Sequence, residues 1–128
     1  MIIDRDFAIR YGDAGWAAGL FEGEGYICFS PKSSVKIGIE MTDFDVLERF
    51  VEIIGVGKIS PRKIRESRHK QRYIWEVRTH MDVKNVLELL LPWLGTRRKT
   101  RAGQAITRIA EIRPTRPYKP RDAMQQGE

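Results

Sequence analysis

Four short segments of the sequence alternate between apolar and polar residues, and this alternation constrains the fold more than any other feature. The segments span residues 26–30, 35–42, 58–63 and 72–78. Because successive side chains of a β-strand point to opposite faces of a sheet, each segment predicts a strand with one buried and one exposed face. Ile27 and Phe29 then belong to the buried face of the first strand, and Trp75 and Val77 to that of the fourth. Residues 31–34 supply a turn, which joins the first two strands into a hairpin.

Apolar residues recur at helical spacing on either side of these strands. The predicted helices are one from an N-cap at Asp13 to about Gly23 or Gly25, one from a capping box at Thr42 and Asp45 to Gly55, one from a cap at Asp82 to Pro92, and one from about Arg98 to Arg113. Each helix has a single apolar stripe, so all of them can cover one face of the sheet and none is left for the other. The sequence therefore predicts an α+β fold in the order helix, two strands, helix, two strands, helix, helix.

The composition is that of one soluble domain with an excess of positive charge. The 128 residues carry 23 Lys and Arg against 17 Asp and Glu, a net charge of +6. A single cysteine, Cys28, excludes an intrachain disulfide and favours a reducing compartment. No apolar run approaches the ~20 residues that a membrane span needs, and residues 1–6 lack the order of a secretory signal. We expect an intracellular protein that is neither secreted nor embedded in a membrane.

The positive charges gather in three clusters, at residues 58–72, 97–101 and 113–121. A single cluster of this kind can be an ordinary solvated face. Three of them, separated by structured segments, fit a surface that follows a phosphate backbone. The outward strand positions are basic as well, at Lys32, Lys36, Arg62, Arg72 and Arg78. This bare sheet face is either a solvent face or a saddle for nucleic acid, and the clustering favours the saddle.

A stripe of small residues runs along the first predicted helix. Gly15, Gly19 and Gly23 follow one another at four-residue spacing, with Ala14 and Ala18 beside them. Glycine inside a helix costs roughly 1 kcal/mol relative to alanine, so its repeated use needs a reason. The stripe lets another backbone approach closely, either that of a second helix or that of the chain's own sheet.

The segment that ends this helix, Ala17–Ala–Gly–Leu–Phe–Glu–Gly–Glu–Gly25, resembles the LAGLIDADG motif of homing endonucleases. Most positions match when Glu stands for Asp at positions 22 and 24. Further segments resemble the family in the same order, at residues 55–59, 73–77, 91–94 and 97–99. The likeness covers roughly residues 14 to 112.

This resemblance implies a single LAGLIDADG domain over residues 1–113, followed by a basic, proline-rich tail over residues 114–128. The implied fold is αββαββα, with a four-stranded, antiparallel, saddle-shaped sheet and the helices on one face. One copy of the motif is present, and in this family a single copy implies a homodimer whose motif helices pack on each other. The residues implied at that interface are Gly15, Ala18, Gly19 and Glu22.

The implied function is that of a site-specific endonuclease encoded in an intron or intein. Such an enzyme cuts a long pseudo-palindromic site in double-stranded DNA and leaves short 3′ overhangs. The implied location is the cytoplasm of a bacterium, an archaeon or a phage host, or an organelle matrix.

The resemblance also implies a metal-dependent active site. Glu24 is the implied metal ligand, and the Gly23 carbonyl is a second one. Mg²⁺ is the expected cofactor because it takes oxygen ligands from one or two carboxylates, phosphate and water. Mn²⁺ is expected to substitute for it, and Ca²⁺ to support binding without cleavage. Arg97 is assigned to charge stabilisation at the phosphate, with Arg98 and Lys99 as competitors for that place.

Two acidic residues each fit two interpretations. Asp43 stands where the family often holds an active-site water, but it also fits the first turn of the following helix. Glu22 is either structural or part of the dimer interface. His69 and His80 have no partners at metal-ligand spacing and are assigned to the surface. The residues expected to contact DNA are Tyr26, Cys28, Ser30, Lys32, Lys36, Gly38, Glu40, Arg62, Arg72, Ile74, Arg78, Arg98 and Lys99.

Two other functions remain open. A non-cleaving DNA or RNA binder on the same scaffold, such as an intron maturase or a regulator, would keep the sheet and lose the metal carboxylate, whereas Glu24 is present here. An RNA-binding sheet of the RRM type would carry its stacking aromatics on the exposed face. Here Phe29, Tyr73 and Trp75 fall on the inner face, which leaves chiefly Tyr26 outside.

Overall fold

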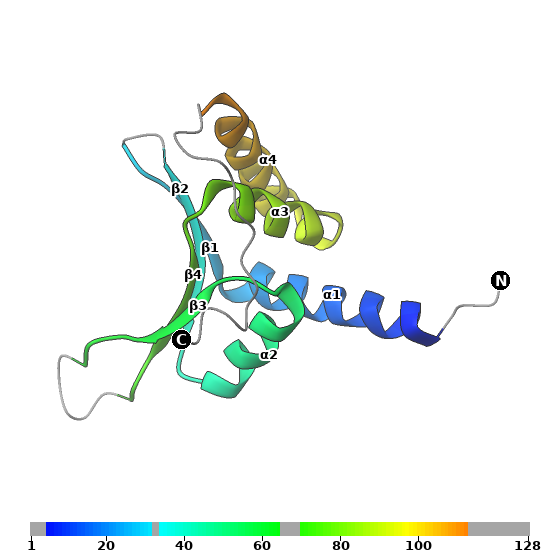
Figure 1. Cartoon of the computed structure of the whole chain (residues 1–128), viewed down its shortest axis with the longest axis vertical. Coiled ribbons are helices and arrows are strands. Elements are labelled where there is room, and N and C mark those ends of the chain that lie inside the picture. Colours follow the sequence, from blue (N-terminus) through cyan, green and yellow to red (C-terminus); the bar gives the residue numbers. More distant parts are fainter. Residues whose placement is uncertain (1–4, 32–33, 65–69, 113–128) are drawn as a thin grey trace.

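The computed structural model describes residues 5–31, 34–64 and 70–112. Its elements are α1 (Arg5–Glu24), β1 (Gly25–Phe29), β2 (Val35–Met41), α2 (Phe44–Ile54), β3 (Lys58–Pro61), β4 (Tyr73–Val77), α3 (His80–Leu90), a short 3₁₀ helix η1 (Leu91–Trp93) and α4 (Thr96–Glu111). Figure 1 shows the sheet as one layer with the helices on one of its faces, and α1 projecting away from the sheet toward the N-terminus. Lys32, His69 and the predicted tail over residues 114–128 lie outside the described residues.

The four strands form one antiparallel sheet in the order β1-β2-β4-β3. β1 and β2 pair as the predicted hairpin, with Gly25 opposite Ile39, and Ile39 in turn lies opposite Trp75 on β4. This register brings the start of β1 and the end of β2 to the same end of the sheet. The predicted α+β fold, with four antiparallel strands and the helices on one face, is confirmed (Figure 1).

The predicted inner faces of the strands form the core. The buried hydrophobic residues of the strands are Ile27, Val35, Ile37, Ile39, Trp75 and Val77. Phe21 of α1 and Phe50 of α2 are fully buried against them. The Trp75 indole Nε1 donates a hydrogen bond to the Val56 carbonyl at 3.0 Å, and its ring meets the Phe50 ring edge-on, with 4.7 Å between centroids. The largest core side chain therefore has its apolar surface packed against other side chains and its one polar atom hydrogen-bonded.

Gly57 makes room for this tryptophan. Its backbone has a φ of 97°, and an added Cβ would overlap the Trp75 indole nitrogen. Gly55, which ends α2, also has a positive φ of 84°, but a Cβ there would meet open space. We expect Gly57→Ala to lower the free energy of unfolding by about 3 kcal/mol or more, and Gly55→Ala by only about 1 kcal/mol. Chemical denaturation of both variants measures the difference, and equal losses would show that crowding of Trp75 adds nothing.

The first helix is longer than the sequence predicts. α1 begins at Arg5, so Asp13 lies inside the helix and is not its N-cap. The Tyr11 ring packs edge-on against the Trp93 ring of η1, with 5.1 Å between centroids. This tertiary contact supports the additional helical turns. It could not be predicted from hydrophobic periodicity, which reports only local sequence.

The predicted starts of the other helices are also displaced. Asp43, not Thr42, is the N-cap of α2, and no side-chain hydrogen bond caps it, so the predicted capping box is wrong. α3 begins at His80, which places the buried Asp82 in its first turn and not at the cap. α4 begins at Thr96, two positions before the predicted start. None of the helices in the described ranges is long and apolar enough to cross a membrane.

Candidate nucleic-acid interface and metal site

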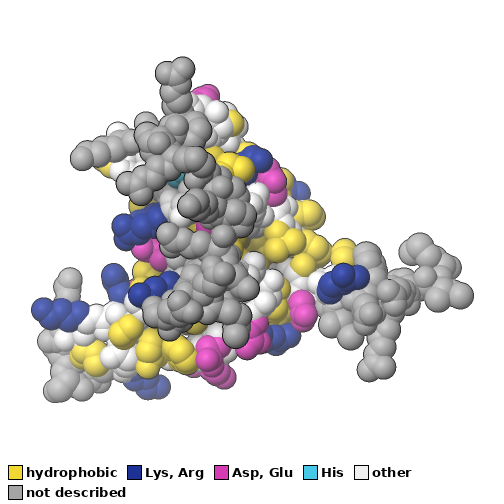
Figure 2. Space-filling model, viewed as in Figure 1, with side chains coloured by type: hydrophobic (Ala, Val, Ile, Leu, Met, Phe, Trp, Pro, Cys, Tyr) yellow, Lys and Arg dark blue, Asp and Glu magenta, His cyan; other side chains and the backbone are white. Residues whose placement is uncertain are grey.

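The sheet face that no helix covers carries the predicted basic residues. Figure 2 shows Lys and Arg side chains along this side of the molecule, with Asp and Glu side chains between them. Arg62, Arg72 and Arg78 are exposed and Lys36 is half-buried. The same face carries Tyr26, Cys28, Glu40 and Ile74, and Ser30 lies in the turn that follows β1.

Two carboxylates divide the basic residues of this face into two groups. The Glu40 carboxylate lies 2.5 Å from Arg62 Nε and 3.6 Å from Arg72 Nε. The Glu76 carboxylate accepts a hydrogen bond from Arg78 Nε at 2.7 Å and one from the Tyr26 hydroxyl at 3.0 Å. Lys36 Nζ lies 3.7 Å from the same carboxylate. Each acid therefore pairs with the cations around it, and the face carries two clusters of opposite charges.

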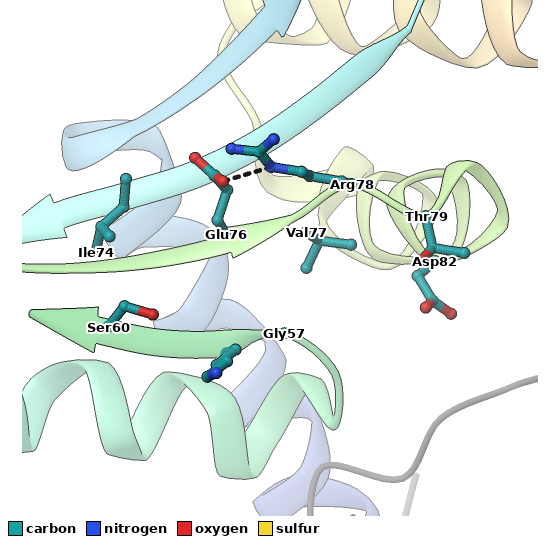
Figure 3. Close-up of a pocket in the computed structure, with 9 residues that line it drawn as sticks. Gly57, Ser60, Ile74, Glu76, Val77, Arg78, Thr79 and Asp82 are labelled. Atoms are coloured by element: carbon teal, nitrogen blue, oxygen red, sulfur yellow. Dashed lines mark hydrogen bonds and ion pairs between the residues drawn. The ribbon is translucent and has the colours of Figure 1, made fainter. Parts of the chain in front are cut away.

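The Glu76 group remains charged in its cluster. Burial on its own raises the pKa of the Glu76 carboxyl, but the hydrogen bonds from Arg78 and Tyr26 and the Lys36 charge outweigh it, so that its pKa lies below the usual value. Burial and the hydrogen bond to Glu76 raise the pKa of the Tyr26 hydroxyl. Figure 3 shows the Glu76–Arg78 pair beside a surface cleft of about 280 Å³ that also reaches Gly57 and Asp82.

Gly38 allows Tyr26 to reach Glu76 across the sheet. Tyr26 lies opposite Gly38 on β2, and Gly38 lies opposite Glu76 on β4. A Cβ at Gly38 would overlap the Tyr26 hydroxyl and would lie 2.7 Å from the Trp75 carbonyl oxygen. Gly38 is buried beneath the tyrosine. The assignment of Gly38 as a DNA contact is therefore wrong, because its place is to let Tyr26 pass over β2.

The predicted metal residues lie at the corner where α1 becomes β1. Glu24 is the last residue of α1 and Gly25 the first of β1, so no loop separates helix from strand. Gly23 and Glu24 are exposed. Gly25 is buried, and a Cβ there would lie 2.5 Å from the Phe21 ring. Only glycine fits at this position, which keeps the exposed pair at the surface while the chain turns into the sheet.

Glu22 is held by the start of α4. Its Oε2 accepts a hydrogen bond from the Gly95 backbone N–H at 3.3 Å and lies 3.8 Å from Arg98 Nε. A Cβ at Gly95 would lie 2.7 Å from the other carboxylate oxygen. These contacts support the structural interpretation of Glu22 within one chain.

The three cations at the start of α4 occupy different places. Arg97 and Lys99 are exposed. The Arg98 guanidinium donates to two backbone oxygens, from Nε to Glu22 O at 2.7 Å and from Nη1 to Gly25 O at 2.5 Å. A surface pocket of about 320 Å³ lies between this part of α4 and β1, lined by Arg97, Arg98, Arg101 and residues 25–27. Positive charge therefore borders the corner that carries Glu24.

The donor atoms at this corner fit a magnesium ion that is shared with a phosphate. Within the described part of the chain, no three His, Cys, Asp or Glu side chains gather into a possible metal site. Mg²⁺ does not require such a group, because it is commonly held by one or two carboxylates with substrate phosphate and water. Glu24 supplies an exposed carboxylate, and the adjacent Gly23 carbonyl supplies a second hard oxygen. This donor set fits Mg²⁺ and does not fit a metal that needs nitrogen or sulfur ligands.

Asp43 lies at the same end of the sheet as this corner. It follows β2, whose end the register places beside the start of β1. The Asp43 side chain is exposed, and its backbone carbonyl accepts from the Val46 and Leu47 N–H groups in the first turn of α2. Both interpretations of this residue are therefore compatible with its position.

The small residues of α1 face two different sides. Ala18 is fully buried in the chain's own core, so its assignment to a dimer interface is wrong. Gly15 faces Trp93, whose indole nitrogen would lie 3.5 Å from an added Cβ. Gly19 and Gly23 are exposed, and an added Cβ at either would meet open space. The tight internal contact is thus the better interpretation of Gly15 and Ala18, while Gly19 and Gly23 present an open surface.

Two residues of this region make contacts that the sequence-based predictions missed. Glu76 pairs with Tyr26, and the signal for it was their shared outward parity on either side of a glycine. Arg101 donates from Nη2 to the Ile27 carbonyl at 3.2 Å, and its guanidinium lies 4.3 Å from the Phe29 ring centroid. The three-residue spacing of Arg98 and Arg101 along α4 was the available signal.

Three solved structures that are similar to this chain are homing endonucleases. I-CvuI, in complex with its target in the presence of Ca, is 20% identical, with a TM-score of 0.62 over 82% of this chain and 69% of that chain. The LAGLIDADG meganuclease I-AabMI, bound to uncleaved DNA, is 19% identical, with a TM-score of 0.55 over 73% of this chain and 35% of that chain. The archaeal intron-encoded homing endonuclease I-Vdi141I, complexed with DNA, is 15% identical, with a TM-score of 0.51 over 95% of this chain and 93% of that chain. No protein-family model matches the sequence.

The chain therefore has the homing endonuclease fold. This agrees with the fold that the motif at residues 17–25 led us to expect.

Proposed function

We propose that this protein is a site-specific endonuclease of the LAGLIDADG type that acts on double-stranded DNA. It works as a homodimer on a long pseudo-palindromic target and hydrolyses phosphodiester bonds to leave short 3′ overhangs. The observation that carries the proposal is the exposed Glu24 at the end of α1, directly beside a sheet face lined with paired cations. The fold and the motif at residues 17–25 support it.

The uncovered sheet face contacts the DNA grooves in this proposal. Its arginines are oriented by Glu40 and Glu76, so they meet base edges with little further ordering. A major-groove contact from arginine to guanine is bidentate, which requires a guanidinium held in a defined plane. The exposed cations of α4 lie next to the corner and contact the phosphates.

The carboxylate corner supplies the chemistry. Glu24 and the Gly23 carbonyl would hold Mg²⁺. When bound, the ion neutralises the charge of the scissile phosphate and lowers the pKa of a coordinated water. Arg97 stabilises the additional negative charge that the phosphate develops during hydrolysis. An arginine is suited to this role but not to proton donation, since its guanidinium stays protonated at any working pH.

The experiment that tests the proposed function uses DNA of random sequence, so the target does not have to be identified first. The protein is incubated with Mg²⁺ and a randomised double-stranded DNA library, and the cut ends are sequenced. We expect one pseudo-palindromic site with short 3′ overhangs. Sequence-specific binding without any cut ends would favour the alternative of a non-cleaving regulator or maturase. Binding to RNA alone would exclude the proposal.

Replacement of one outward arginine should alter specificity at one place in each half-site. We expect Arg72→Ala to relax the base preference at a single position of each half-site, at about 1–3 kcal/mol of discrimination. Because Arg62 shares Glu40 with Arg72, a smaller change at the base next to it should accompany the main one. Sequencing of the library selected by the variant measures both changes. A uniform loss of affinity over all sequences would instead make Arg72 a phosphate contact.

A further inference from the structure

Arg98 differs from the other cations of α4 in what its guanidinium binds. Its side chain is 18% exposed, and its Nε and Nη1 atoms donate to the backbone oxygens of Glu22 and Gly25. Arg97 and Lys99, on either side of it in sequence, are exposed. Successive helical residues point about 100° apart, so the three cannot share one role.

The two backbone oxygens that Arg98 binds belong to the residues just before and just after the candidate metal ligands. Gly23 and Glu24 lie between Glu22 and Gly25 in sequence, at the C-terminal end of α1. The last carbonyls of a helix have no partner within the helix, and they carry the negative end of its dipole. The last turn of α1 contains no basic residue of its own. Arg98 therefore supplies, from another helix, the cation and the donors that this helix end lacks.

The rest of the corner is held from the same side. The Glu22 carboxylate accepts the Gly95 N–H, and its other oxygen would lie 2.7 Å from a Cβ at Gly95. The start of α4 thus fixes the end of α1 through the Arg98 side chain, the Gly95 backbone donor and the close approach of Gly95 to Glu22. The exposed Glu24 side chain is attached to the part of the backbone that these contacts hold.

We infer that Arg98 is a positioning residue, which orients the Gly23 carbonyl and the Glu24 carboxylate toward the metal. This inference rests on the proposed function, and it leaves contact with the phosphate to the exposed Arg97. A planar guanidinium can donate to two carbonyls at once from fixed directions, whereas a lysine ammonium carries the same charge on one atom. Arg98→Lys therefore keeps the charge and removes the paired geometry.

The test compares Arg98→Lys and Arg98→Met with the wild type, and Arg108→Met is the matched control. Arg108 lies on the same helix, and its guanidinium stacks on the Phe29 ring at 4.5 Å, away from the corner. Single-turnover cleavage is measured as a function of Mg²⁺ concentration, and DNA affinity is measured in Ca²⁺. Hydrogen exchange of the amides in residues 23–26 supplies a readout that does not depend on activity.

We expect both Arg98 variants to need at least about tenfold more Mg²⁺ for half-maximal cleavage, as for the loss of other groups that orient metal ligands. Amide exchange in residues 23–26 should be at least about tenfold faster in both, because two charge-assisted hydrogen bonds are lost. DNA affinity in Ca²⁺ should be unchanged for Arg98→Lys, and Arg108→Met should match the wild type in all three measurements.

Wild-type behaviour of Arg98→Lys in exchange and in Mg²⁺ requirement would overturn the inference, since charge alone would then suffice. An equal loss of rate at every Mg²⁺ concentration, with unchanged exchange, would also overturn it and would make Arg98 a phosphate contact. If Arg98→Met does not fold, the measurements on Arg98→Lys alone test whether Arg98 positions the corner. If the wild type cuts no DNA, the proposed function fails, and the exchange measurement still decides whether Arg98 holds the corner.

Discussion

Glu24→Gln should retain DNA binding and lose cleavage. The substitution keeps nearly the same shape and removes the negative charge that, in the proposed function, holds the cation. In the proposed function, affinity comes from the basic sheet face and from phosphate contacts, so it should stay level or rise when a carboxylate near DNA is neutralised. The cleavage rate should fall by roughly 10³-fold or more, because hydrolysis needs a metal at the scissile phosphate. Gel-shift and single-turnover cleavage measurements on one DNA site separate the two effects.

A matched control for this variant is Glu52→Gln. Glu52 is exposed on α2, on the helical side of the sheet, and its substitution removes the same charge. The control should bind and cut as the wild type does, and replacing Mg²⁺ by Ca²⁺ in the wild type should reproduce binding without cleavage. Full cleavage by Glu24→Gln would move the catalytic carboxylate elsewhere. Asp43 is then the first candidate, since Glu22 is already held by Gly95 and Arg98.

Gly19→Leu should convert an active dimer into a folded, inactive monomer. Each chain has one copy of the motif and one Glu24, so an active site with two carboxylates needs two chains. A leucine at the exposed Gly19 would separate the two motif helices that the proposed dimer packs together, and by twofold symmetry the damage would occur on both sides. Within one chain the new side chain meets open space, and leucine is a better helix former than glycine by roughly 0.8 kcal/mol. Loss of activity would therefore not come from unfolding.

The matched control for this variant is Gly103→Leu. Gly103 is another helical glycine, on α4, and an added Cβ there also meets open space. Sedimentation at micromolar concentration should show a dimer for the wild type and for the control, and a monomer for Gly19→Leu with an unchanged or higher melting temperature. A wild type that sediments as a monomer while it still cuts DNA would refute the dimer.

The strand faces could be predicted from sequence because they depend on a local signal. Alternation with a period of two assigns each side chain to a face without knowledge of its partners, and the buried positions of β1, β2 and β4 confirm it. The corner at Glu24 could be predicted from sequence for a different reason, because the motif contains its glycines and carboxylates in one short segment. What could not be predicted depends on contacts between distant residues. Arg98 and the Glu22 carbonyl are 76 positions apart, and neither periodicity nor composition links them.

The two sides of α1 show the same limit on a smaller scale. Gly15, Ala18 and Gly19 are all small, and only the packing of η1 and the core distinguishes the half-buried Gly15 and the buried Ala18 from the exposed Gly19. The start of α1 follows the same principle, because Tyr11 is helical where it meets Trp93. A sequence can indicate that a helix has a small-residue face, but which neighbour occupies that face is decided by the rest of the fold.

Closure of one sheet edge by arginines limits how copies of this protein can associate. β1 is an edge strand, and strands with unpaired carbonyls invite a further strand from another molecule. Here the Gly25 and Ile27 carbonyls accept from Arg98 and Arg101, so a helix rich in positive charge takes the positions that an incoming strand would need. Growth of the sheet into a continuous intermolecular ribbon is blocked at that edge. Association through the helices is not affected by this closure, so copies of the chain are directed to meet through helical surfaces and not through β1.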